Sequence, residues 1–320
     1  MSVDRLGSNT VPHTSEYAIA IVMTARILII AGSDSGGGAG VQADIKTVTM
    51  LGGHAMIAVT AITAQNTLGV QAVHQIPTDM VLAQIESVVS DIGVDAVKIG
   101  MIGSAATANA VADRLVSLFS REGGSPDWTP AFAGEQGRAG HHHPARIPIV
   151  FDPVMIATSG SILADPATIA AFTRLMRIAT LVTPNLPELA ALGGEAAIRA
   201  LGPAVLVKGG HAEGPSVTDR LVTDTGETRW TNPRIETRHA HGTGCTLASG
   251  IATGLAQGMT LDAAVDRAIA FVRAALAAAP GIGQGHGPMG HGLDTIPFYH
   301  LLAATNSDGW DAQAFAARWS

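Results

Sequence analysis

The sequence predicts an α/β fold, a three-layer α/β/α sandwich with a mostly parallel central sheet, from two observations. Apolar runs of strand length alternate with segments of helical periodicity from residue 26 onward. Runs such as ILIIA and IPIVF are apolar throughout, which suits strands that helices cover on both faces. Hydrophobic residues make up 47% of the 320-residue chain and charged residues only 14%, so the chain can bury a large core and is not a disordered scaffold.

Each predicted strand in the first part of the chain is followed by a predicted helix. Strands are expected at residues 26–31, 54–64 and 95–99, and helices at 41–51, 78–92 and 105–119. The next segment, 120–146, is rich in glycine, proline and polar residues and has no sustained period. We therefore interpret it as an exposed insertion.

The alternation resumes after this insertion. Strands at 147–152, 180–183 and 204–208 alternate with helices at 166–177 and 187–192. A hairpin at 216–223 and 228–232, which turns around Asp224 and Gly226, precedes helices at 243–257 and 261–279. We interpret residues 25–297 as one domain, with a flexible leader at 1–24 and a C-terminal tail at 298–320.

Charge and the leader exclude several classes of protein. The formal net charge is -7, from 19 basic and 26 acidic residues, and gives no electrostatic footprint for nucleic acid. The leader has acidic and polar residues where a signal peptide needs a basic end and an apolar run. Segment 17–32 is interrupted by Arg26, whereas a membrane span needs about 20 apolar residues. We expect a cytoplasmic protein that binds neither nucleic acid nor a membrane.

A glycine-rich turn follows the first strand, at the edge where open parallel sheets bind their ligands. The turn, from Gly32 to Gly40, reads GSDSGGGAG and lets a ligand approach the backbone closely. It lacks the lysine of a P-loop, and a dinucleotide fingerprint would lack its acidic residue near 58–66. A turn needed only for chain geometry is the alternative interpretation.

Polar side chains near the first two strands are candidate ligand contacts. Asp44 and Lys46 stand on the first helix, where a buried carboxylate is expected to hydrogen-bond a polar ligand. A solvated helix face explains them equally well. Gln65 and Asn66 end the second strand, and a side-chain amide offers a heteroaromatic ring both a donor and an acceptor. A strand-end cap is the alternative.

The strongest motif is HGTGCTL at 241–247, where a helix begins. Successive N–H groups from Gly242 to Cys245, together with the helix dipole, are expected to form an anion-binding site that suits phosphate. The same position is expected to lower the pKa of Cys245, the only cysteine, so that its thiolate acts as a base or nucleophile. A small buried cysteine is the alternative, but it does not explain the two glycines.

Three further side chains follow strands and carry charge. Lys208 ends an apolar strand, where its ammonium needs an anion such as phosphate. Asp152 and Glu188 could hold Mg²⁺ directly or through water, although Glu188 could instead cap a helix. The histidine run at 141–143 has no companion motif, so we interpret it as a solvated loop and not as a metal site.

Eight ordered segments together resemble one family. They are AGSDSGGGAGVQADIKT, TAQNTLGVQAV, DAVKIGM, DPVM, TPNLPE, LVKGGH, HGTGCTLASG and GHGPMGH, spread over residues 26–292. By these motifs the chain is similar to the hydroxymethylpyrimidine/phosphomethylpyrimidine kinases, the thiamine-biosynthesis branch of the ribokinase superfamily. The resemblance implies a ribokinase-like sandwich, a homodimer, and transfer of the γ-phosphoryl group of ATP with Mg²⁺. The implied acceptors are 4-amino-5-hydroxymethyl-2-methylpyrimidine and then its monophosphate.

The resemblance also implies roles for the residues that match the family's motifs. The pyrimidine pocket would be formed by Gly32, Asp44, Gln65, Met101 and Val154. The nucleotide phosphates and magnesium would be served by Asn185, Lys208, Thr243, Gly244, Asp152 and Glu188. Cys245 would be the catalytic base, assisted by Lys208, Gly242 and Gly244, where most of the superfamily has an aspartate.

Three segments depart from the family pattern, and two other functions stay open. Residues 157–161 read ATSGS where a lysine and an acid are common, the insertion 120–146 is long, and 192–204 is short, so nucleotide affinity is expected to differ. A pyridoxal or pyridoxine kinase would share the anion site, but Gln65 and the first glycine turn favour a pyrimidine. A non-catalytic pyrimidine sensor would not need Cys245 and Lys208.

Overall fold

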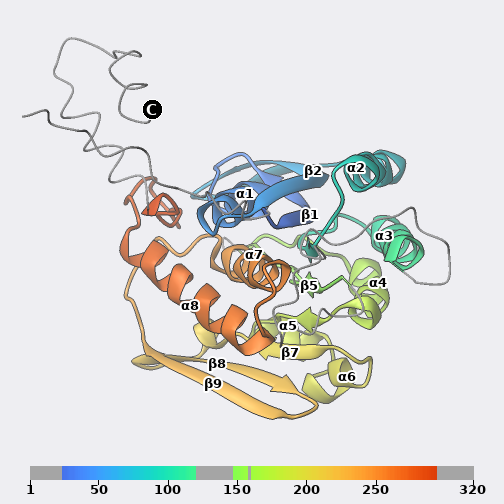
Figure 1. Ribbon diagram of the computed structural model, residues 1–320. Coiled ribbons are helices and arrows are strands. Elements are labelled where there is room, and N and C mark those ends of the chain that lie inside the picture. Colours follow the sequence, from blue (N-terminus) through green and yellow to red (C-terminus); the bar gives the residue numbers. More distant parts are fainter. Residues whose placement is uncertain (1–23, 120–146, 158–159, 294–320) are drawn as a thin grey trace, which may run out of the picture.

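The structure is a computed structural model that describes residues 24–119, 147–157 and 160–293 (Figure 1). The expected leader, insertion and tail lie outside these residues, except for Thr24. A nine-stranded sheet, in the order β3-β2-β1-β4-β5-β6-β7-β8-β9, forms the centre of the described chain.

The sheet is parallel in its middle and antiparallel at both edges. Pairing is parallel from β2 through β1, β4, β5 and β6 to β7, whereas β3, β8 and β9 are antiparallel to their neighbours. The strands are β1 (Arg26–Asp34), β2 (His54–Asn66), β3 (Gly69–Gln75), β4 (Ala96–Ile99), β5 (Ile149–Phe151), β6 (Leu181–Val182), β7 (Ala204–Val207), β8 (Ser216–Thr223) and β9 (Gly226–Pro233). The predicted mostly parallel sheet is confirmed.

Helices cover both faces of this sheet, so the predicted three layers are present (Figure 1). They are α1 (Gly40–Met50), α2 (Thr78–Asp91), α3 (Ala105–Phe119), α4 (Pro166–Ile178), α5 (Leu186–Ala191), α6 (Glu195–Arg199), α7 (Thr243–Ala256) and α8 (Leu261–Ala277), with a 3₁₀ turn at Gly209–His211. Residues of α1, α7 and α8 share one hydrophobic core, and residues of α2, α3, α4 and α6 share the other.

Strand β1 explains why a continuous apolar run forms the middle of the sheet. Successive side chains of a strand point to opposite faces. Leu28 and Ile30 therefore join the core under α2, α3 and α4, while Ile27 and Ile29 join the core under α1, α7 and α8. All four are fully buried, so a run without polar interruption is what a doubly covered strand requires.

Two elements were not expected from the sequence. Strand β3 pairs antiparallel with β2 at the edge of the sheet, and five of its seven residues are exposed, so it has no apolar run to reveal it. Helix α6 is only five residues long. In the described residues no helix has the length and apolar character needed to cross a membrane.

Candidate active site

The start of α7 has a glycine as its N-cap residue and no side-chain cap among the described residues. Gly242 is the N-cap residue, with φ of 90°, and a Cβ built on it would lie 1.9 Å from the carbonyl oxygen of Gly38. Only glycine fits this position, which joins the predicted anion site to the first glycine turn. No side chain of the described residues caps α7. The N–H of Thr243 bonds to the carbonyl of Ala240 at 3.4 Å, so the amide of Gly244 and the helix dipole are what this start offers an anion such as phosphate.

Lys208 lies beside this helix start. Its Nζ donates to Oδ1 of Asp152 at 2.6 Å and lies 3.7 Å from Oε2 of Glu188. A Cβ built on Gly244 would lie 3.3 Å from the same Nζ and 3.4 Å from Oδ2 of Asp152. The fold therefore brings together the ends of β5 and β7, the start of α5 and the first turn of α7.

Glu188 and Asn185 close a capping box at the start of α5. The Asn185 side chain accepts from the backbone N–H of Glu188 at 2.8 Å, and Oε2 of Glu188 accepts from the backbone N–H of Asn185 at 2.9 Å. The alternative interpretation of Glu188 as a helix cap is thus confirmed, and its role toward magnesium stays a prediction. Burial raises the pKa of Glu188, and Asp152 adds to this while Lys208 opposes it.

The chemistry of this corner fits Mg²⁺. The ion prefers a few carboxylate oxygens and keeps phosphate oxygens and waters as its other ligands. Asp152 and Glu188 supply carboxylates on either side of Lys208. Among the described residues no group of three or more histidine, cysteine, aspartate or glutamate side chains could enclose a metal, so the pair suits an ion that arrives with nucleotide phosphates.

The predicted pyrimidine residues lie at the same edge of the sheet. The sulfur of Met101 lies 3.0 Å from a Cβ built on Gly32, so glycine leaves this methionine its place. Val154 is partly buried, and its backbone N–H donates to the carbonyl of Asp152 at 2.8 Å. Gln65 is the penultimate residue of β2, and its Nε2 lies 3.1 Å from Nε2 of His241.

Asp34 is a site residue that the sequence argument missed. Its carboxylate accepts from the backbone N–H groups of Gly36, Gly38 and Ala39 at 2.8 to 3.0 Å. Nε2 of His241 lies 2.9 Å from the same carboxylate. Burial raises the pKa of Asp34, but the bonds from His241 and the backbone outweigh burial and hold this pKa below its ordinary value. The aspartate within GSDSGGG was the available signal.

Asp44 is occupied by a buried ion pair. Both of its oxygens accept from Nζ of Lys98, at 2.9 and 2.8 Å, and Oδ1 also accepts from Oγ of Ser249 at 2.7 Å. The carboxylate and the ammonium are fully buried. A direct contact of Asp44 with the pyrimidine stays a prediction, since this carboxylate is already committed to Lys98 and Ser249.

The predicted effect of the helix start on Cys245 is wrong. Burial raises the pKa of this thiol to about 11, and the carboxylates of Asp44 and Asp152 raise it further, while Lys98 opposes them. The helix dipole and glycine turn are therefore weaker than desolvation and two nearby anions. A thiol with this pKa is almost entirely protonated at neutral pH.

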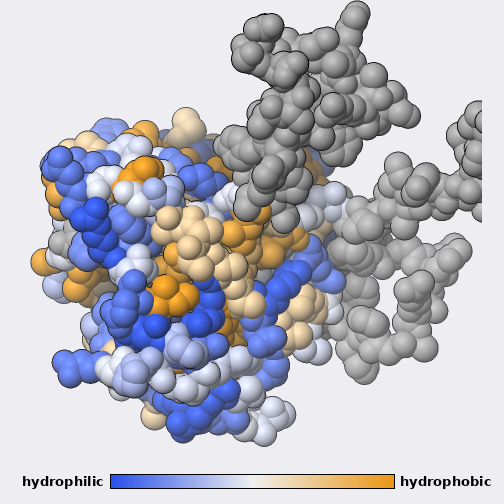
Figure 2. All heavy atoms as spheres, turned by 90° about the vertical axis from the view of Figure 1, so that its left-hand side faces the viewer, coloured by the Kyte–Doolittle hydropathy of each residue, from blue (hydrophilic) through white to orange (hydrophobic). Residues whose placement is uncertain are grey.

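A hollow of about 230 Å³ lies beside Met101 and is lined by residues of β3 and of segment 162–165. Hydrophobic residues gather in the middle of the face that carries α8, and mostly hydrophilic residues lie below them (Figure 2).

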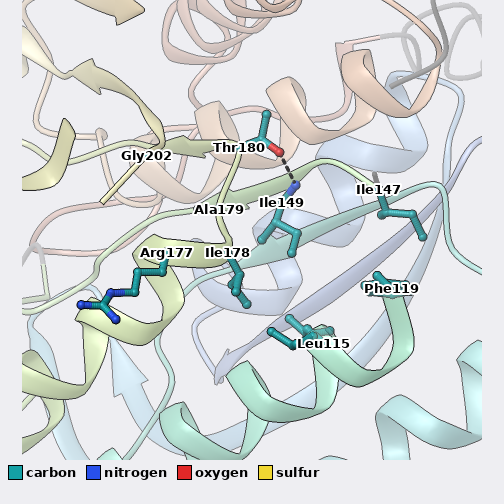
Figure 3. Close-up of a pocket in the computed structure, with 10 residues that line it drawn as sticks. Leu115, Phe119, Ile147, Ile149, Arg177, Ile178, Ala179, Thr180 and Gly202 are labelled. Atoms are coloured by element: carbon teal, nitrogen blue, oxygen red, sulfur yellow. Dashed lines mark hydrogen bonds between the residues drawn. The ribbon is translucent and has the colours of Figure 1, made fainter. Parts of the chain in front are cut away.

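The other hollow lies at the opposite edge of the sheet. Its volume is about 210 Å³, and Figure 3 shows its mostly apolar lining between α3 and α4, with Leu115, Phe119 and Ile149 inside. The hydroxyl of Thr180 accepts from the backbone N–H of Ile149 at 3.1 Å. This second hollow contains none of the predicted site residues, so we do not assign the active site to it.

Comparison with known proteins decides the family. A model of the family described as phosphomethylpyrimidine kinase matches residues 34–122 and 139–290. The chain belongs to the phosphomethylpyrimidine kinase family. A hydroxymethylpyrimidine/phosphomethylpyrimidine kinase of Streptomyces coelicolor is 43% identical over 281 residues, which cover 83% of this chain and 94% of the relative.

Solved structures of kinases share the fold. A phosphomethylpyrimidine kinase of Clostridium difficile has a TM-score of 0.62 at 33% identity and covers 79% of this chain and 99% of its own. A pyridoxal kinase of Bacillus subtilis, solved as an ADP complex, has a TM-score of 0.69 at 28% identity and covers 84% and 97%. The predicted ribokinase-like sandwich is therefore confirmed.

Proposed function

We propose that this kinase phosphorylates 4-amino-5-hydroxymethyl-2-methylpyrimidine with ATP and then phosphorylates the monophosphate, in thiamine biosynthesis. One observation carries the proposal: Lys208, with Asp152 at 2.6 Å, stands beside the uncapped start of α7, next to the glycine turn of β1. A cation, a helix start and a carboxylate at one point suit a phosphoryl group in transfer.

Phosphoryl transfer is catalysed mainly by aligning the substrates and by stabilising charge on the transferred group. The substrate hydroxyl oxygen forms a bond to the γ-phosphorus while the bond from that phosphorus to the β-phosphate oxygen breaks. The amides of Gly242, Thr243 and Gly244, with Lys208, would stabilise the charge on the transferred group. Asn185 would contact the nucleotide phosphates. When bound, Mg²⁺ at Asp152 and Glu188 would neutralise phosphate charge.

Cys245 would accept the proton of the substrate hydroxyl. The bond from oxygen to hydrogen breaks as the bond to phosphorus forms, and the proton passes to Sγ. Only the thiolate can accept this proton. Because burial raises the pKa of this thiol to about 11, the thiolate is a small fraction at neutral pH and grows as the pH rises.

The ring would lie between the first glycine turn and the end of β2. Gln65 is suited to bind it, because Nε2 of His241 already faces the Asp34 carboxylate at 2.9 Å. If that nitrogen donates to Asp34, it cannot also accept from the Gln65 amide 3.1 Å away. The amide would then be free to turn toward a ring nitrogen, with Gly32, Met101 and Val154 beside it.

A pyridoxal kinase is the second candidate, favoured by the TM-score of 0.69 to the Bacillus subtilis pyridoxal kinase. The identity to pyrimidine kinases, 43% for the Streptomyces coelicolor relative against 28% for that structure, favours the pyrimidine. A pyrimidine sensor without catalysis would not need the cation and helix start described above.

The experiment measures ADP production by the purified protein with Mg²⁺ and ATP. Hydroxymethylpyrimidine, its monophosphate and pyridoxal are compared in parallel, with Cys245→Ala as the control. Turnover of both pyrimidines that collapses in the variant supports the proposal. Turnover of pyridoxal alone favours the second candidate, and binding of a pyrimidine without ADP favours the sensor.

We further propose that the protein is a cytoplasmic homodimer. Within the described residues, strand β3 ends the sheet and has no strand partner on its outer side. Ile62 on β2, Val73 on β3, and Ile156 and Ile162 are exposed apolar residues. An exposed edge strand with apolar residues beside it is a surface that proteins usually bury, and a second copy of the chain would bury it. Sedimentation equilibrium tests it: we expect a dimer that Val73→Lys weakens, and a monomer across the micromolar range would refute it.

A further inference from the structure

Lys98 is a buried charge that the mechanism above does not use. It lies on β4, in the middle of the sheet, and its side chain is fully buried against the fully buried Asp44. Taking two charges out of water is costly, and such pairs are often no better for stability than apolar residues of similar size. Stability alone therefore does not account for a lysine at this position.

The geometry places the Lys98 ammonium on the face of the sheet that α1 and α7 cover. A Cβ built on Gly100, just past the end of β4, would lie 2.8 Å from Nζ of Lys98, so the side chain bends toward the site edge of the sheet. Ser249, which donates to Asp44 at 2.7 Å, stands four residues after Cys245 and thus on the same face of α7. Through Ser249, the ion pair is therefore bonded to the face of α7 that also carries Cys245.

We propose that Lys98 is a positioning residue for Cys245: fixed by Asp44 and Ser249, its ammonium stabilises the negative charge that the sulfur needs in order to accept a proton. This role rests on the kinase activity proposed above. An ammonium has three N–H donors, and Nζ of Lys98 donates to both oxygens of Asp44. Its charge is therefore held in place from one side.

Several charged groups surround the thiol of Cys245, and Lys98 is the one that most favours its thiolate. The groups that act on Cys245 from the packed elements are Lys98 of β4, Asp44 of α1, Asp152 after β5, Lys208 after β7 and the backbone N–H of Gly40. After burial, Lys98 is the strongest influence on the pKa of Cys245 and the main one that lowers it. Burial lowers the pKa of Lys98 itself, but Asp44, Cys245 and Asp152 together outweigh burial and raise this pKa, so the ammonium stays charged.

The chain allows a direct test because Cys245 is its only cysteine. Iodoacetamide reacts with the thiolate: sulfur bonds to the carbon, and iodide leaves. The alkylation rate followed by intact mass from pH 7 to 10 therefore reports the thiolate fraction of this residue alone. Lys98→Met removes the charge, and Lys98→Arg keeps it.

A matched control lies at the other edge of the sheet. Arg26 on β1 forms an ion pair with Asp95 at 2.7 Å, and the Asp95 side chain is almost fully buried. Arg26→Met breaks an ion pair of the same sheet far from the thiol. Thermal unfolding checks that each variant is folded, and Lys98→Gln replaces Lys98→Met if the latter does not fold.

We expect Lys98→Met to slow alkylation about threefold or more at pH 8 and to move its pH dependence upward, since the thiolate fraction falls with each increase of the thiol pKa. The alkylation rate of Lys98→Arg should stay closer to that of the unchanged protein than the rate of Lys98→Met does. Arg26→Met should be alkylated at the rate of the unchanged protein, although it is less stable. Equal rates for folded Lys98→Met and the unchanged protein would overturn the proposal. A loss in Arg26→Met as large as in Lys98→Met would overturn it as well.

The pH dependence of ADP production separates this proposal from the kinase assignment. If the unchanged protein phosphorylates the pyrimidine, the rise of turnover with pH should shift upward in Lys98→Met, as the alkylation profile does. If the unchanged protein forms no ADP with any of the three substrates, the proposed function fails. The alkylation rates would still decide whether Lys98 supports the thiolate.

Discussion

Nε2 of His241 lies 2.9 Å from Oδ2 of Asp34, although 207 positions separate the two residues. The bond joins the glycine turn after β1 to the residue that precedes the Gly242 cap of α7. The same Asp34 carboxylate organises the glycine turn through three backbone N–H groups. One buried side chain thus sets the distance between the proposed pyrimidine and phosphate subsites.

Asp34→Asn should therefore destabilise the protein and impair catalysis together. An amide group in place of one oxygen turns a donor toward the backbone donors of the turn, and a buried group left without its bond costs about 1–3 kcal/mol. We expect the free energy of unfolding in urea to fall by about 2–3 kcal/mol. Asp79→Asn, on the exposed first turn of α2, should change it by less than about 0.5 kcal/mol. An equal effect in both variants would contradict this account.

Lys208→Met should reduce turnover far more than it reduces stability. The methionine keeps the length of the side chain but leaves the transferred phosphoryl group and Asp152 without their cation. Loss of one preorganised charge of this kind costs about 100-fold in kcat. Steady-state kinetics with saturating ATP measure it, and Arg177→Met, at the opposite edge of the sheet, is the control. A less than about fivefold loss would remove Lys208 from the proposed phosphoryl site.

The rate of the chemical step should rise with pH. Burial raises the pKa of the Cys245 thiol to about 11, so the thiolate fraction increases about tenfold per pH unit across the neutral range. We expect single-turnover rates to climb from pH 7 to pH 9 and to lose this dependence in Cys245→Ser. A flat profile in the unchanged protein would show that the reaction does not need the thiolate.

Stability should fall as the solution becomes acidic, through His291. Burial, with help from Lys46, lowers the pKa of this histidine to about 4 from 6.5, and its Nε2 lies 2.8 Å from the hydroxyl of Thr246. The unfolded chain binds a proton near pH 6.5 and the folded chain only near pH 4, so acid between these values favours unfolding. The difference corresponds to about 3 kcal/mol.

Urea unfolding at pH 6.5 and at pH 4.5 checks the role of His291. His291→Gln should lose less stability between these two values than the unchanged protein does. His286→Gln, an exposed residue of the same segment, should behave like the unchanged protein. If His291→Gln keeps the full dependence, other groups cause it.

The sequence carried the fold well because burial dictates its patterns. The run ILIIA, five apolar residues before a glycine turn, is typical of a strand covered on both faces, and β1 is such a strand. Strand β3 escaped because an exposed edge strand needs no apolar pattern: its residues from 71 to 75 are all exposed. Its pairing with β2 becomes evident only in three dimensions.

The sequence predicted individual residues of the site but not the hydrogen bonds and ion pairs that join distant residues in it. Lys208, Asp152 and Gly244 were found because each follows a strand or opens a helix, and the fold brings them within a few ångströms. The bonds of Asp34 to His241 and of Lys98 to Asp44 join residues 207 and 54 positions apart, which no local pattern encodes. The prediction of a lowered pKa for Cys245 was wrong for the same reason, since burial and carboxylates that are distant in the sequence raise this pKa.

Phosphorus NMR of the reaction products tests the central claim most directly. The unchanged protein, Mg²⁺, ATP and 4-amino-5-hydroxymethyl-2-methylpyrimidine are incubated together, and the spectra are recorded over time. The account predicts that a pyrimidine monophosphate resonance appears first and is then replaced by the two resonances of a diphosphate. If ATP is consumed only when pyridoxal is supplied, or if no phosphorylated pyrimidine forms, the account is contradicted.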